Sequence, residues 1–415
     1  MTDIIVGLDI GTSFVRVAIG VINEVNAIEI IGVAKKESRG LRNGVIVNIE
    51  ATMDCIKAVI EEAEQKAGWE VSSCIVGIGG RQIESMNAKG MVAISPGKGD
   101  REITQADVER VLEAANAVQI PMDRQRLHII PQEYIVDGMP GCKDPIHMIA
   151  VRLEAEVHIV TASRTAIQNM TSCLSRAGYE RDRVMLKTLA CAEAVMLAEE
   201  KELGSILIDL GGGTTDVLVI LHDAPICTAS IPVGGSLVTN DIALVKGIPV
   251  ATAENIKVTS GCCWEGALDK DEEVLIPGIA GRDPEQTTKS ELCQIIRPRM
   301  EEIFTMVRDE VVRSTNVRQL SGSVILTGGG ALMSGAVALA QYVFGTSSVR
   351  IGAPSKLGGI EEEYRTADYA TAVGLVVANK TPVVEKPTRK ERRHADGGDG
   401  REGDSFLRKL KRMFF

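Results

Sequence analysis

The residues best suited to chemistry lie in a glycine-rich run near the middle of the chain. The run Asp209-Leu-Gly-Gly-Gly-Thr-Thr-Asp216 joins two apolar segments with the composition of β-strands. Three consecutive glycines allow a sharp turn that exposes backbone N–H groups, and such a nest, with hydroxyls beside it, suits a phosphate. The Asp209 carboxylate is directed to the same place, which fits an anionic ligand if a divalent cation with its water lies between them.

A second copy of this pattern lies near the start of the chain. The run Ile4-Ile-Val-Gly-Leu-Asp-Ile-Gly-Thr-Ser-Phe-Val-Arg-Val-Ala-Ile19 repeats the order strand, Asp, apolar residue, Gly, hydroxyl pair, strand, and Asp9 precedes Asp209 by 200 residues. Two such hairpins facing each other across a cleft can hold the phosphates of a nucleotide between two domains. Two ordinary glycine-rich β-turns are the alternative, which the repetition makes the weaker interpretation.

Three further features extend this candidate site. Arg16 leaves the first hairpin and either reaches back to a phosphate or is an exposed strand residue. Glu193 lies on a predicted helix, Leu186–Lys201, and either orients an attacking water or is a surface or capping residue. Val324-Ile-Leu-Thr-Gly-Gly-Gly-Ala331 repeats the strand and glycine turn before a predicted helix, whose N-terminus favours a polar or anionic group.

Composition limits the classes of protein to consider. A chain of 415 residues should hold at least two domains, and its net charge of −10 argues against a general nucleic-acid binder. Nine cysteines without a C-x-x-C pair fit a reducing cytosol rather than a disulfide framework or a zinc site. Asp3 and Asp9 interrupt the first apolar run, so no secretory signal is expected, and glycines between Gln319 and Val349 make that uncharged span a poor membrane helix.

Hydrophobic periodicity predicts alternating strands and helices in both halves. Strands are expected at 4–8, 15–21, 28–33 and 73–78, and helices at 49–67, 165–177, 237–244, 252–258, 289–314, 331–344 and 369–377. Between the first strands and the helix at 165–177, the chain reads as a compact β-rich insertion. There Arg81–Ile94 is predicted to be a strand pair with a turn near Asn87–Gly90, and Thr104 begins a helix with a capping-box-like sequence.

The last residues predict a membrane-binding helix. From Asn379 to Gly403 the composition is that of a disordered linker. On a helix after it, one face would carry Phe406, Leu407, Leu410, Met413 and Phe414, the rest would carry Arg408, Lys409, Lys411 and Arg412, and Phe415 follows. A helix of about eleven residues rises only about 16 Å, which is too short to span a bilayer. We therefore expect it to lie in the interface of an anionic leaflet. One copy should bind modestly, which implies several copies acting together.

Paired Asp-x-Gly-Thr hairpins with a third glycine turn resemble the superfamily of actin, the sugar kinases and the DnaK-type chaperones. Within it, nearly the whole chain is similar to the FtsA family of bacterial cell-division proteins. The motifs that carry the resemblance are Gly7-Leu-Asp-Ile-Gly-Thr-Ser13, Arg101-Glu-Ile-Thr104, Ile130-Pro-Gln-Glu-Tyr134, Val136-Asp-Gly138, Arg152-Leu-Glu154, Ala190-Cys-Ala-Glu-Ala194, Asp209-Leu-Gly-Gly-Gly-Thr-Thr-Asp216, Ile231-Pro-Val-Gly-Gly235, Val238-Thr-Asn-Asp-Ile-Ala243 and Ala253-Glu-Asn-Ile-Lys257.

The resemblance implies an α/β, actin-like, two-domain duplicated fold with a small α+β subdomain inserted in the first half and a C-terminal amphipathic helix. The expected parts are a first core subdomain at 1–82, completed by 162–188 and about 366–380; the insertion at 83–161; a second core subdomain at 189–245 and 318–365; its small subdomain at 246–317; a linker at 380–403; and the terminal helix at 404–415.

The resemblance also implies a function. Such a protein binds ATP with Mg²⁺, has at most weak ATPase activity, and polymerises through the inserted subdomain. It tethers the tubulin-like FtsZ to the cytoplasmic face of the inner membrane at the division site, as a peripheral membrane protein, and recruits later division proteins. The FtsZ tail would dock on 246–317.

Site residues carry over position by position. Asp9, Asp209 and Asp216 would arrange the metal and its water, and Glu193 would orient the attacking water. Nucleotide contacts would come from Gly11, Thr12, Ser13, Arg16, Gly211, Gly212, Gly213, Thr214, Thr215, Gly235, Glu254, Lys257, Gly328, Gly329 and Gly330. Many relatives have Lys where this chain has Phe14, so a phosphate contact from that position is lost, and Arg16 is the possible substitute.

Two other classes share the fold. A sugar or acid kinase needs a substrate-side general base, for which the sequence offers only Glu193, and it gives no reason for a basic amphipathic tail. A chaperone-type ATPase needs a substrate domain after the ATPase, for which the residues after Val377 are too few. A P-loop enzyme is excluded because no G-x-x-x-x-G-K-[ST] sequence occurs.

Overall fold

Two five-stranded sheets form the frame of the protein. The computed structural model describes residues 4–94, 101–268, 270–278, 283–315 and 322–379. The first sheet has the order β13-β6-β1-β2-β3 and the second β16-β15-β14-β19-β20. In each, the first three strands along the chain pair antiparallel, and the last two join in parallel. The second half therefore repeats the topology of the first, and the duplicated α/β fold predicted from the two hairpins is confirmed.

The strands fall where alternating apolar sequence predicts them. The first sheet contains β1 (Ile4–Ile10), β2 (Phe14–Ile22), β3 (Ile28–Glu37), β6 (Ser73–Ile78) and β13 (Glu180–Leu186). The second contains β14 (Ser205–Leu210), β15 (Thr215–Leu221), β16 (Ala224–Ile231), β19 (Val324–Thr327) and β20 (Val349–Ile351). Both aspartates of the repeated hairpins lie near the carboxyl ends of their strands, so the two hairpin turns lie at corresponding edges of the two sheets.

Outer helices cover the far face of each sheet. In the first half these are α1 (Ile49–Ala67) and α3 (Arg164–Arg176), and in the second half α8 (Lys289–Thr315) and α9 (Ala336–Phe344). Helix α1 buries Cys55, Ile56, Val59, Ile60 and Ala63 on one face, and it ends at Gly68, which takes a left-handed conformation. The helical spacing of apolar residues thus predicts both the existence of α1 and the face that it packs on the sheet.

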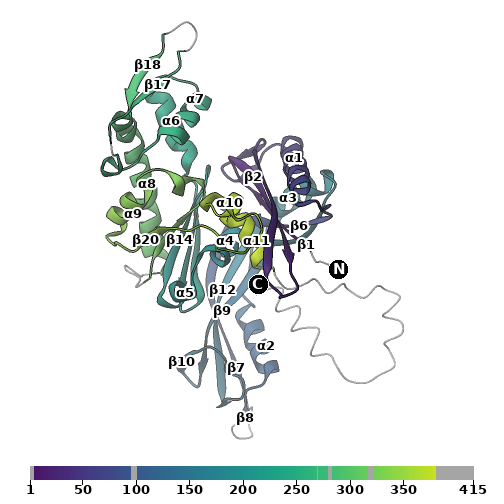
Figure 1. Cartoon of the computed structure of the whole chain (residues 1–415). Helices are drawn as coiled ribbons and strands as arrows, with labels where there is room; N and C mark the ends of the chain where they lie inside the picture. The colour runs from purple at the N-terminus through teal and green to yellow at the C-terminus, as the bar shows by residue number, and fades with distance from the viewer. Residues whose placement is uncertain (1–3, 95–100, 269, 279–282, 316–321, 380–415) are drawn as a thin grey trace.

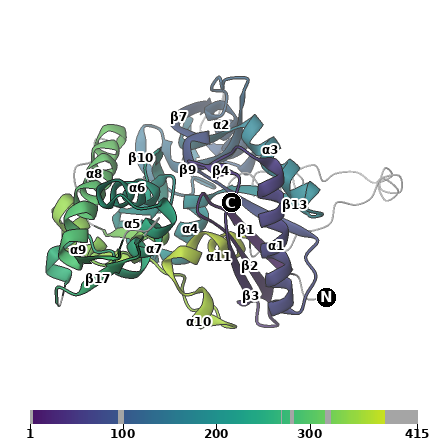
Figure 2. The same ribbon diagram turned by 90° about the horizontal axis from the view of Figure 1, so that it is seen from above.

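Two short helices pack between the sheets. Helices α4 (Lys187–Val195) and α11 (Ala370–Val377) share one hydrophobic cluster with strands of both sheets, and Figure 2 shows them between the two halves. The packing is close, because a Cβ on Gly374 would lie 2.0 Å from the carbonyl oxygen of Ala190, and one on Gly7 would lie 2.3 Å from that of Ala372. Glycine at these two places lets α11 contact α4 and β1 directly.

The prediction of one long helix at Leu186–Lys201 is wrong, because the structure has two helices there. Helix α4 ends at Val195, Met196 and Leu197 are extended, and α5 (Ala198–Leu203) follows. The carboxylate of Glu200 accepts a hydrogen bond from the Leu197 amide at 2.9 Å and starts α5. Arg350 contacts both the Val195 carbonyl oxygen and the Glu200 carboxylate, which holds the break in place.

The insertion in the first half is a four-stranded antiparallel sheet with one helix. Figure 1 shows it projecting from the lower end of the molecule. The sheet has the order β10-β9-β12-β7, a separate pair joins β11 to β8, and α2 covers one face. Its elements are β7 (Ile83–Ala93), β8 (Arg101–Glu102), α2 (Gln105–Ala115), β9 (Arg124–Val136), β10 (Met139–Cys142), β11 (Ile149–Ala150) and β12 (Arg152–Ser163).

The strand pair predicted at Arg81–Ile94 is wrong, because β7 runs unbroken through Asn87 and Gly90. Gly90 does not turn the chain. A Cβ there would lie 2.3 Å from the backbone nitrogen of Ala115 and 2.5 Å from the carbonyl oxygen of Val111, so this glycine admits α2 against the sheet. Single-sequence patterns do not distinguish a turn glycine from a packing glycine.

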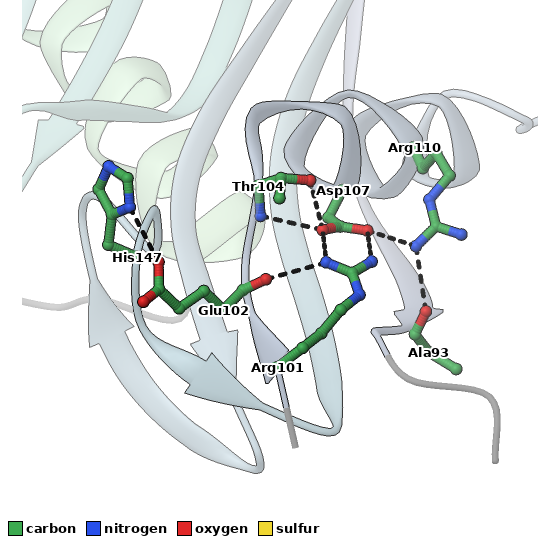
Figure 3. A network of polar contacts seen from close by, with 7 residues as sticks. All are labelled: Ala93, Arg101, Glu102, Thr104, Asp107, Arg110 and His147. Carbon is green, nitrogen blue, oxygen red and sulfur yellow. Dashed lines mark hydrogen bonds and ion pairs between the residues drawn. The ribbon is translucent and has the colours of Figure 1, made fainter. Parts of the chain in front are cut away.

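A buried carboxylate organises the far end of the inserted subdomain (Figure 3). Asp107 accepts two hydrogen bonds from Arg101, at 2.6 and 2.7 Å, and one from Arg110 at 2.6 Å. It also accepts from the Thr104 amide at 2.9 Å, at the start of α2. These contacts, with that of Arg101 first, hold the pKa of Asp107 well below its usual range despite burial. The Arg101-Glu-Ile-Thr104 motif therefore fixes β8 against the start of the helix.

Side chains of the inserted subdomain also form hydrogen bonds with β16, the edge strand of the second sheet. Ser85 and Asn87 on β7 donate to the carbonyl oxygens of Thr228 and Ile226 on β16, at 2.8 and 3.0 Å. His158 on β12 lies 3.0 Å from the Thr228 hydroxyl. The subdomain thus contacts both halves of the protein, by its covalent connections on one side and by these polar contacts on the other.

The small subdomain of the second half, expected at 246–317, contains α7 (Val250–Ser260), the pair β17 (Glu273–Ile276) and β18 (Glu285–Thr288), and α8. Helix α6 (Gly235–Lys246) comes just before it and packs on α7 and α8. Figure 1 shows this part at the opposite end from the inserted subdomain. The predicted linker and amphipathic helix, 380–415, lie outside the described residues. Within the described part of the chain, every helix is too short or too polar to cross a membrane.

Histidine burial makes stability depend on pH. His128 on β9 accepts a hydrogen bond from the Leu186 amide at 3.0 Å, and burial lowers its pKa to about 4. In the unfolded chain a histidine has a pKa near 6.5, so between about pH 6.5 and pH 4 it binds a proton that the buried His128 does not. The contribution of His128 to the free energy of unfolding is therefore fully present above about pH 6.5 and is lost as the pH falls toward 4. We expect the protonation of His128 to lower the free energy of unfolding by roughly 3 kcal/mol over this pH range.

Urea unfolding at pH 7 and pH 4.5 checks this expectation. His128→Gln keeps an acceptor for the Leu186 amide and should show a smaller fall in the free energy of unfolding than the unchanged protein. The exposed His147 gives the matched control, because His147→Gln should leave the fall unaltered. Equal falls in all three proteins would contradict the prediction.

Candidate functional site

A cleft of about 480 Å³ lies between the two halves, where the hairpin turns meet. The residues of the sequence-predicted site that line it are Asp9, Gly11, Thr12, Ser13, Arg16, Asp209, Gly211, Gly212, Gly213, Thr214, Asp216, Gly235, Glu254, Lys257, Gly328, Gly329 and Gly330. They come from segments that are far apart in the chain. The structure therefore brings together nearly all of the residues that the two hairpins and the third glycine turn single out.

The two hairpin turns have the same internal geometry. The Gly11 amide donates to the Phe14 carbonyl oxygen at 3.0 Å, and the Gly211 amide donates to that of Thr214 at 3.0 Å. The turns also touch each other, because a Cβ on Gly213 would lie 2.7 Å from the Thr12 hydroxyl and 2.8 Å from the Cα of Asn43. Two equivalent turns thus meet across the cleft, as a shared anionic ligand requires.

The other glycine turns are built onto the second hairpin. The amides of Gly235 and Ser236, at the start of α6, donate to the carbonyl oxygens of Gly211 and Gly212 at 2.9 and 2.8 Å. Gly328 has a φ of +78°, and a Cβ there would lie 2.3 Å from a carboxylate oxygen of Asp209. Only glycine satisfies both conditions at that place. The third glycine turn therefore borders the same aspartate that the second hairpin presents.

Three carboxylates concentrate negative charge on the cleft floor. Asp9 and Asp216 are each only 7% exposed, and Asp216 accepts hydrogen bonds from the Ser230 hydroxyl and from the Gly80 amide. Burial, with the carboxylates of Asp216 and Asp9 nearby, raises the pKa of Asp209 to about 7. Burial also raises the pKa of Asp216, although Ser230 partly opposes it. Burial is the main cause of both raised pKa values, and a bound cation would offset the cost of charging these buried carboxylates.

Lys187 is a cleft residue that sequence reasoning missed. Its ammonium lies 2.6 Å from a carboxylate oxygen of Asp9 and donates to the Ile10 carbonyl oxygen at 2.8 Å. Burial lowers the pKa of Lys187, but the carboxylates around it, Asp9 first, outweigh burial and hold that pKa above its usual value. One signal was present in the sequence, because a lysine at the first position of a helix opposes the helix dipole and needs a tertiary reason.

The carboxylates fit a hydrated metal better than a directly ligated one. Over the described residues, no three His, Cys, Asp or Glu side chains are grouped closely enough to hold a metal ion. Asp9, Asp209 and Asp216 nonetheless line one cleft, where burial and the other two carboxylates raise the pKa of Asp209. This combination matches Mg²⁺, which keeps several waters and binds through few carboxylates together with phosphate oxygens.

The position of Phe14 is surrounded by cations. The guanidinium of Arg16 lies 5.1 Å from the centre of the Phe14 ring, and the Lys35 ammonium lies 5.7 Å from it. Both cations also contact Asp368, at 3.0 and 3.6 Å, and all four residues line the cleft. Arg16 is therefore not a free strand residue. It is a cleft cation that Asp368 holds in this structure.

Glu254 and Lys257 lie on α7 at the other end of the cleft. Lys257 contacts the Glu254 carboxylate at 2.7 Å, the Thr239 hydroxyl at 2.8 Å and the Gly235 carbonyl oxygen at 3.1 Å. These contacts tie α7 to the start of α6. Met300, Ile303 and Met333 supply apolar surface near them in the cleft lining, so this end combines polar groups with a surface for a flat ring.

Two sequence-predicted residues are not in the cleft lining. Glu193 is exposed on α4 and pairs with Lys201 at 2.7 Å, so the expectation that it orients an attacking water is not supported by its position. The face that α4 presents to the cleft carries Lys187 at its start instead. Thr215 is buried, and its hydroxyl donates to the Val233 carbonyl oxygen at 2.9 Å, which gives it a structural partner.

Comparison with known proteins gives the family. A family model described as "Cell division protein FtsA" matches residues 206–374, and one described as "SHS2 domain inserted in FTSA" matches 80–161. The chain is 43% identical to the cell division protein FtsA of Borreliella burgdorferi over 376 residues, which cover 90% of each protein. This chain belongs to the FtsA family. It is also 42% identical to FtsA of Pseudomonas aeruginosa, covering 90% of this chain and 88% of that one, and 36% identical to FtsA of Escherichia coli, covering 94% and 93%.

Solved structures place this FtsA family member among the actin-like folds. A PilM–PilN complex of type IV pilus biogenesis has a TM-score of 0.66 at 17% identity, covering 91% of this chain and 99% of that chain. MreB5 of Spiroplasma citri, in a structure bound to ADP, has a TM-score of 0.53 at 14% identity, covering 95% and 99%. The predicted actin-like architecture with an inserted subdomain is therefore confirmed.

The contact between the two turns predicts a glycine requirement. Gly213→Ala should place a methyl group against Thr12 and the Asn43 backbone, and should lower the free energy of unfolding by about 1–3 kcal/mol. Gly329→Ala is the control in the same cleft, because a Cβ there meets nothing within 4 Å and should leave stability nearly unchanged. Urea denaturation without nucleotide measures both. Equal stability of the two variants would mean that the turns do not meet in solution.

Proposed function

We propose that this chain is an ATP-binding, self-assembling tether that attaches an FtsZ-type filament to the cytoplasmic face of the inner membrane and recruits later division proteins. The observation that carries the nucleotide part is the meeting of two equivalent glycine turns in a cleft that three aspartates also line. Membership of the FtsA family supports the cell-division part. ADP in the MreB5 structure supports adenine nucleotide binding by a protein of this fold.

Each group in the cleft has a role in this proposal. The amides and hydroxyls of the two turns, Thr12, Ser13 and Thr214 among them, bind the phosphates. Asp9, Asp209 and Asp216 would hold Mg²⁺ through its water, and the bound metal would supply charge neutralisation. Glu254 and Lys257 contact the ribose or the adenine, beside the apolar surface at that end of the cleft.

We propose at most weak ATP hydrolysis. Glu193, the expected water-orienting carboxylate, pairs with Lys201 on the protein surface. Of the carboxylates on the cleft floor, Asp9 contacts Lys187, and Asp216 accepts hydrogen bonds from Ser230 and Gly80. A cleft arranged in this way suits a nucleotide that sets the shape of a subunit.

A groove between α6 and α8 supports docking of the FtsZ tail on the small subdomain of the second half. It is lined by Asp241, Leu244, Val245, Gln294, Ile295, Pro298, Arg299 and Glu302. Leu244 is 83% exposed and Val245 is 62% exposed, so apolar side chains face solvent there. Arg299 lies in the groove, paired with Asp241 at 2.7 Å and with Glu302. The exposed apolar side chains fit the apolar residues of an extended or helical peptide.

The remaining parts have the roles that the sequence suggests. The helix at 404–415 binds the anionic leaflet through Phe406, Leu407, Leu410, Met413 and Phe414, with its cations at the headgroups. Self-assembly gives many weak anchors at once and therefore stable attachment. The inserted subdomain, which projects from the body, supplies a contact between subunits (Figure 1).

Nucleotide binding is tested by calorimetry with Mg²⁺ and ATP. Asp209→Ala removes the carboxylate that borders two of the three glycine turns, and we expect it to weaken Mg²⁺–ATP binding by about three- to tenfold. Asp54→Ala, at an exposed position on α1, should bind as the unchanged protein does. Unchanged affinity in Asp209→Ala would refute the cleft as the nucleotide site.

Tethering is tested by co-sedimentation of FtsZ with anionic liposomes in the presence of this protein. Phe414→Asp places a charge on the apolar face of the terminal helix, so both this protein and FtsZ should stay in the supernatant. Phe414→Leu keeps that face apolar and should sediment normally. Leu244→Glu places a charge in the α6–α8 groove, so this protein should still sediment while FtsZ does not.

Leu203→Glu is the control for the second variant, because Leu203 is 56% exposed on α5, away from the groove. If Phe414→Asp still sediments, the membrane helix is wrong. If FtsZ follows Leu244→Glu to the liposomes, the tail docks elsewhere.

A further inference from the structure

The Lys187 side chain crosses the floor of the cleft from one element to another. Lys187 is the first residue of α4, at the end of β13, and its ammonium reaches the carboxyl end of β1. A cation at a helix N-terminus faces the positive end of the helix dipole, which costs stability at that position. Lys187 is unfavourable at this position of the helix, and only 14% of its side chain is exposed, so we expect it to have a role in the cleft.

Two glycines make a channel for the apolar stem of this lysine. A Cβ on Gly77 would lie 3.0 Å from Cγ of Lys187. A Cβ on Gly79 would lie 3.2 Å from Cδ of Lys187 and 2.8 Å from a carboxylate oxygen of Asp216. Larger residues at either place would displace the stem or the carboxylate. The path of Lys187 is therefore built into the backbone of β6 and of the turn after it.

The ammonium lies among oxygen atoms that would also attract a metal ion. It contacts the Asp9 carboxylate and the Ile10 carbonyl oxygen, at 2.6 and 2.8 Å. Asp209 and Asp216 line the same cleft, and neither carboxylate has Lys187 as a direct contact in the described structure. The Lys187 ammonium is therefore one positive charge in a site with three carboxylates, and it neutralises their charge only in part.

We propose that Lys187 is a resident cation of the nucleotide site, which does part of the work of Mg²⁺ and makes nucleotide binding only weakly dependent on the metal. The ammonium is a compact charge on a flexible stem, so it can move from Asp9 toward a phosphate oxygen without leaving the channel. This inference rests on the proposed ATP binding for its effect on affinity. Its effect on the nucleotide-free protein does not.

A purely structural ion pair is the competing explanation. A buried pair contributes little net stability, because the cost of removing both charges from water offsets their attraction. Removing one member, however, leaves the other charge buried without a partner. Lys187→Met would therefore destabilise the protein under either explanation. The two differ in whether Mg²⁺ alone reverses the loss and in whether the metal dependence of nucleotide binding changes.

The first measurement is thermal unfolding of the full chain without nucleotide, with and without Mg²⁺. Lys187→Met keeps a stem of similar shape, and it should unfold at a lower temperature than the unchanged protein. Addition of Mg²⁺ should restore much of this loss, because the vacated place among the carboxylates can take the metal. The same addition should raise the unfolding temperature less in the unchanged protein and in Lys201→Met, whose lysine pairs with Glu193 outside the cleft.

The second measurement is calorimetry with ATP, in Mg²⁺ and in EDTA. In the unchanged protein, removal of the metal should weaken ATP binding by less than about tenfold, since Lys187 remains beside the phosphates. In Lys187→Met the same removal should weaken binding by roughly 100-fold, the effect of losing a charged hydrogen-bonding partner. Lys201→Met should behave as the unchanged protein.

The outcomes separate this inference from the proposed function. If the unchanged protein binds ATP in Mg²⁺ but not in EDTA, Lys187 is not a resident cation, and this conclusion does not need the variant to fold. Equal metal dependence in both proteins, or a destabilised Lys187→Met that Mg²⁺ does not rescue, leaves only the structural ion pair. If the unchanged protein fails to bind ATP under any condition, the proposed function is wrong, and the rescue by Mg²⁺ still tests the cation.

Discussion

Three carboxylates, those of Asp9, Asp209 and Asp216, lie on the cleft floor, and the surrounding structure must accommodate their repulsion. Asp9 and Asp209 end equivalent strands of a duplicated fold, so closing the two halves brings their carboxylates toward each other and toward Asp216. Burial, and then repulsion by Asp216 and Asp9, favour protonation of Asp209, whose pKa rises to about 7. The Lys187 ammonium opposes that tendency at Asp209, and the Ser230 hydroxyl and the Gly80 amide oppose it at Asp216. Glycine turns surround this charge because their amides are the uncharged groups that an anionic ligand needs there.

Much of the site could be predicted because its chemistry is local in sequence. The hairpin turns act through backbone amides and through the aspartates that precede them, so composition and spacing within a single run identify them. Lys187 differs, because its reach to Asp9 depends on where α4 starts relative to β1 and on two glycines of β6 and the following turn. Glu193 lies outside the cleft lining for a related reason, since the face that a short helix shows to a cleft is set by tertiary packing.

The fold shows the same division between local and distant information. Periodicity located α1 and β6 because their apolar faces repeat within a few residues. It missed the single long strand β7 because Gly90, which reads as a turn residue, is required by the distant helix α2. It also joined α4 to α5, because the extended residues between them are held by Arg350, far along the chain. Contacts at long sequence separation therefore account for each of these errors.

The way in which the inserted subdomain joins the first half has a consequence for folding. Its first strand β7 and its last strand β12 are hydrogen-bonded neighbours over their whole length, from Ile83 opposite Ala162 to Ala93 opposite Arg152. The chain therefore leaves and re-enters the first half at nearly the same point. Strands β6 and β13, on either side of the insertion in sequence, pair directly with each other. Once the inserted sheet has formed, the entropy of closing the host sheet is close to that of a short connection rather than of a long loop. The first half can thus complete its sheet almost as if the insertion were absent.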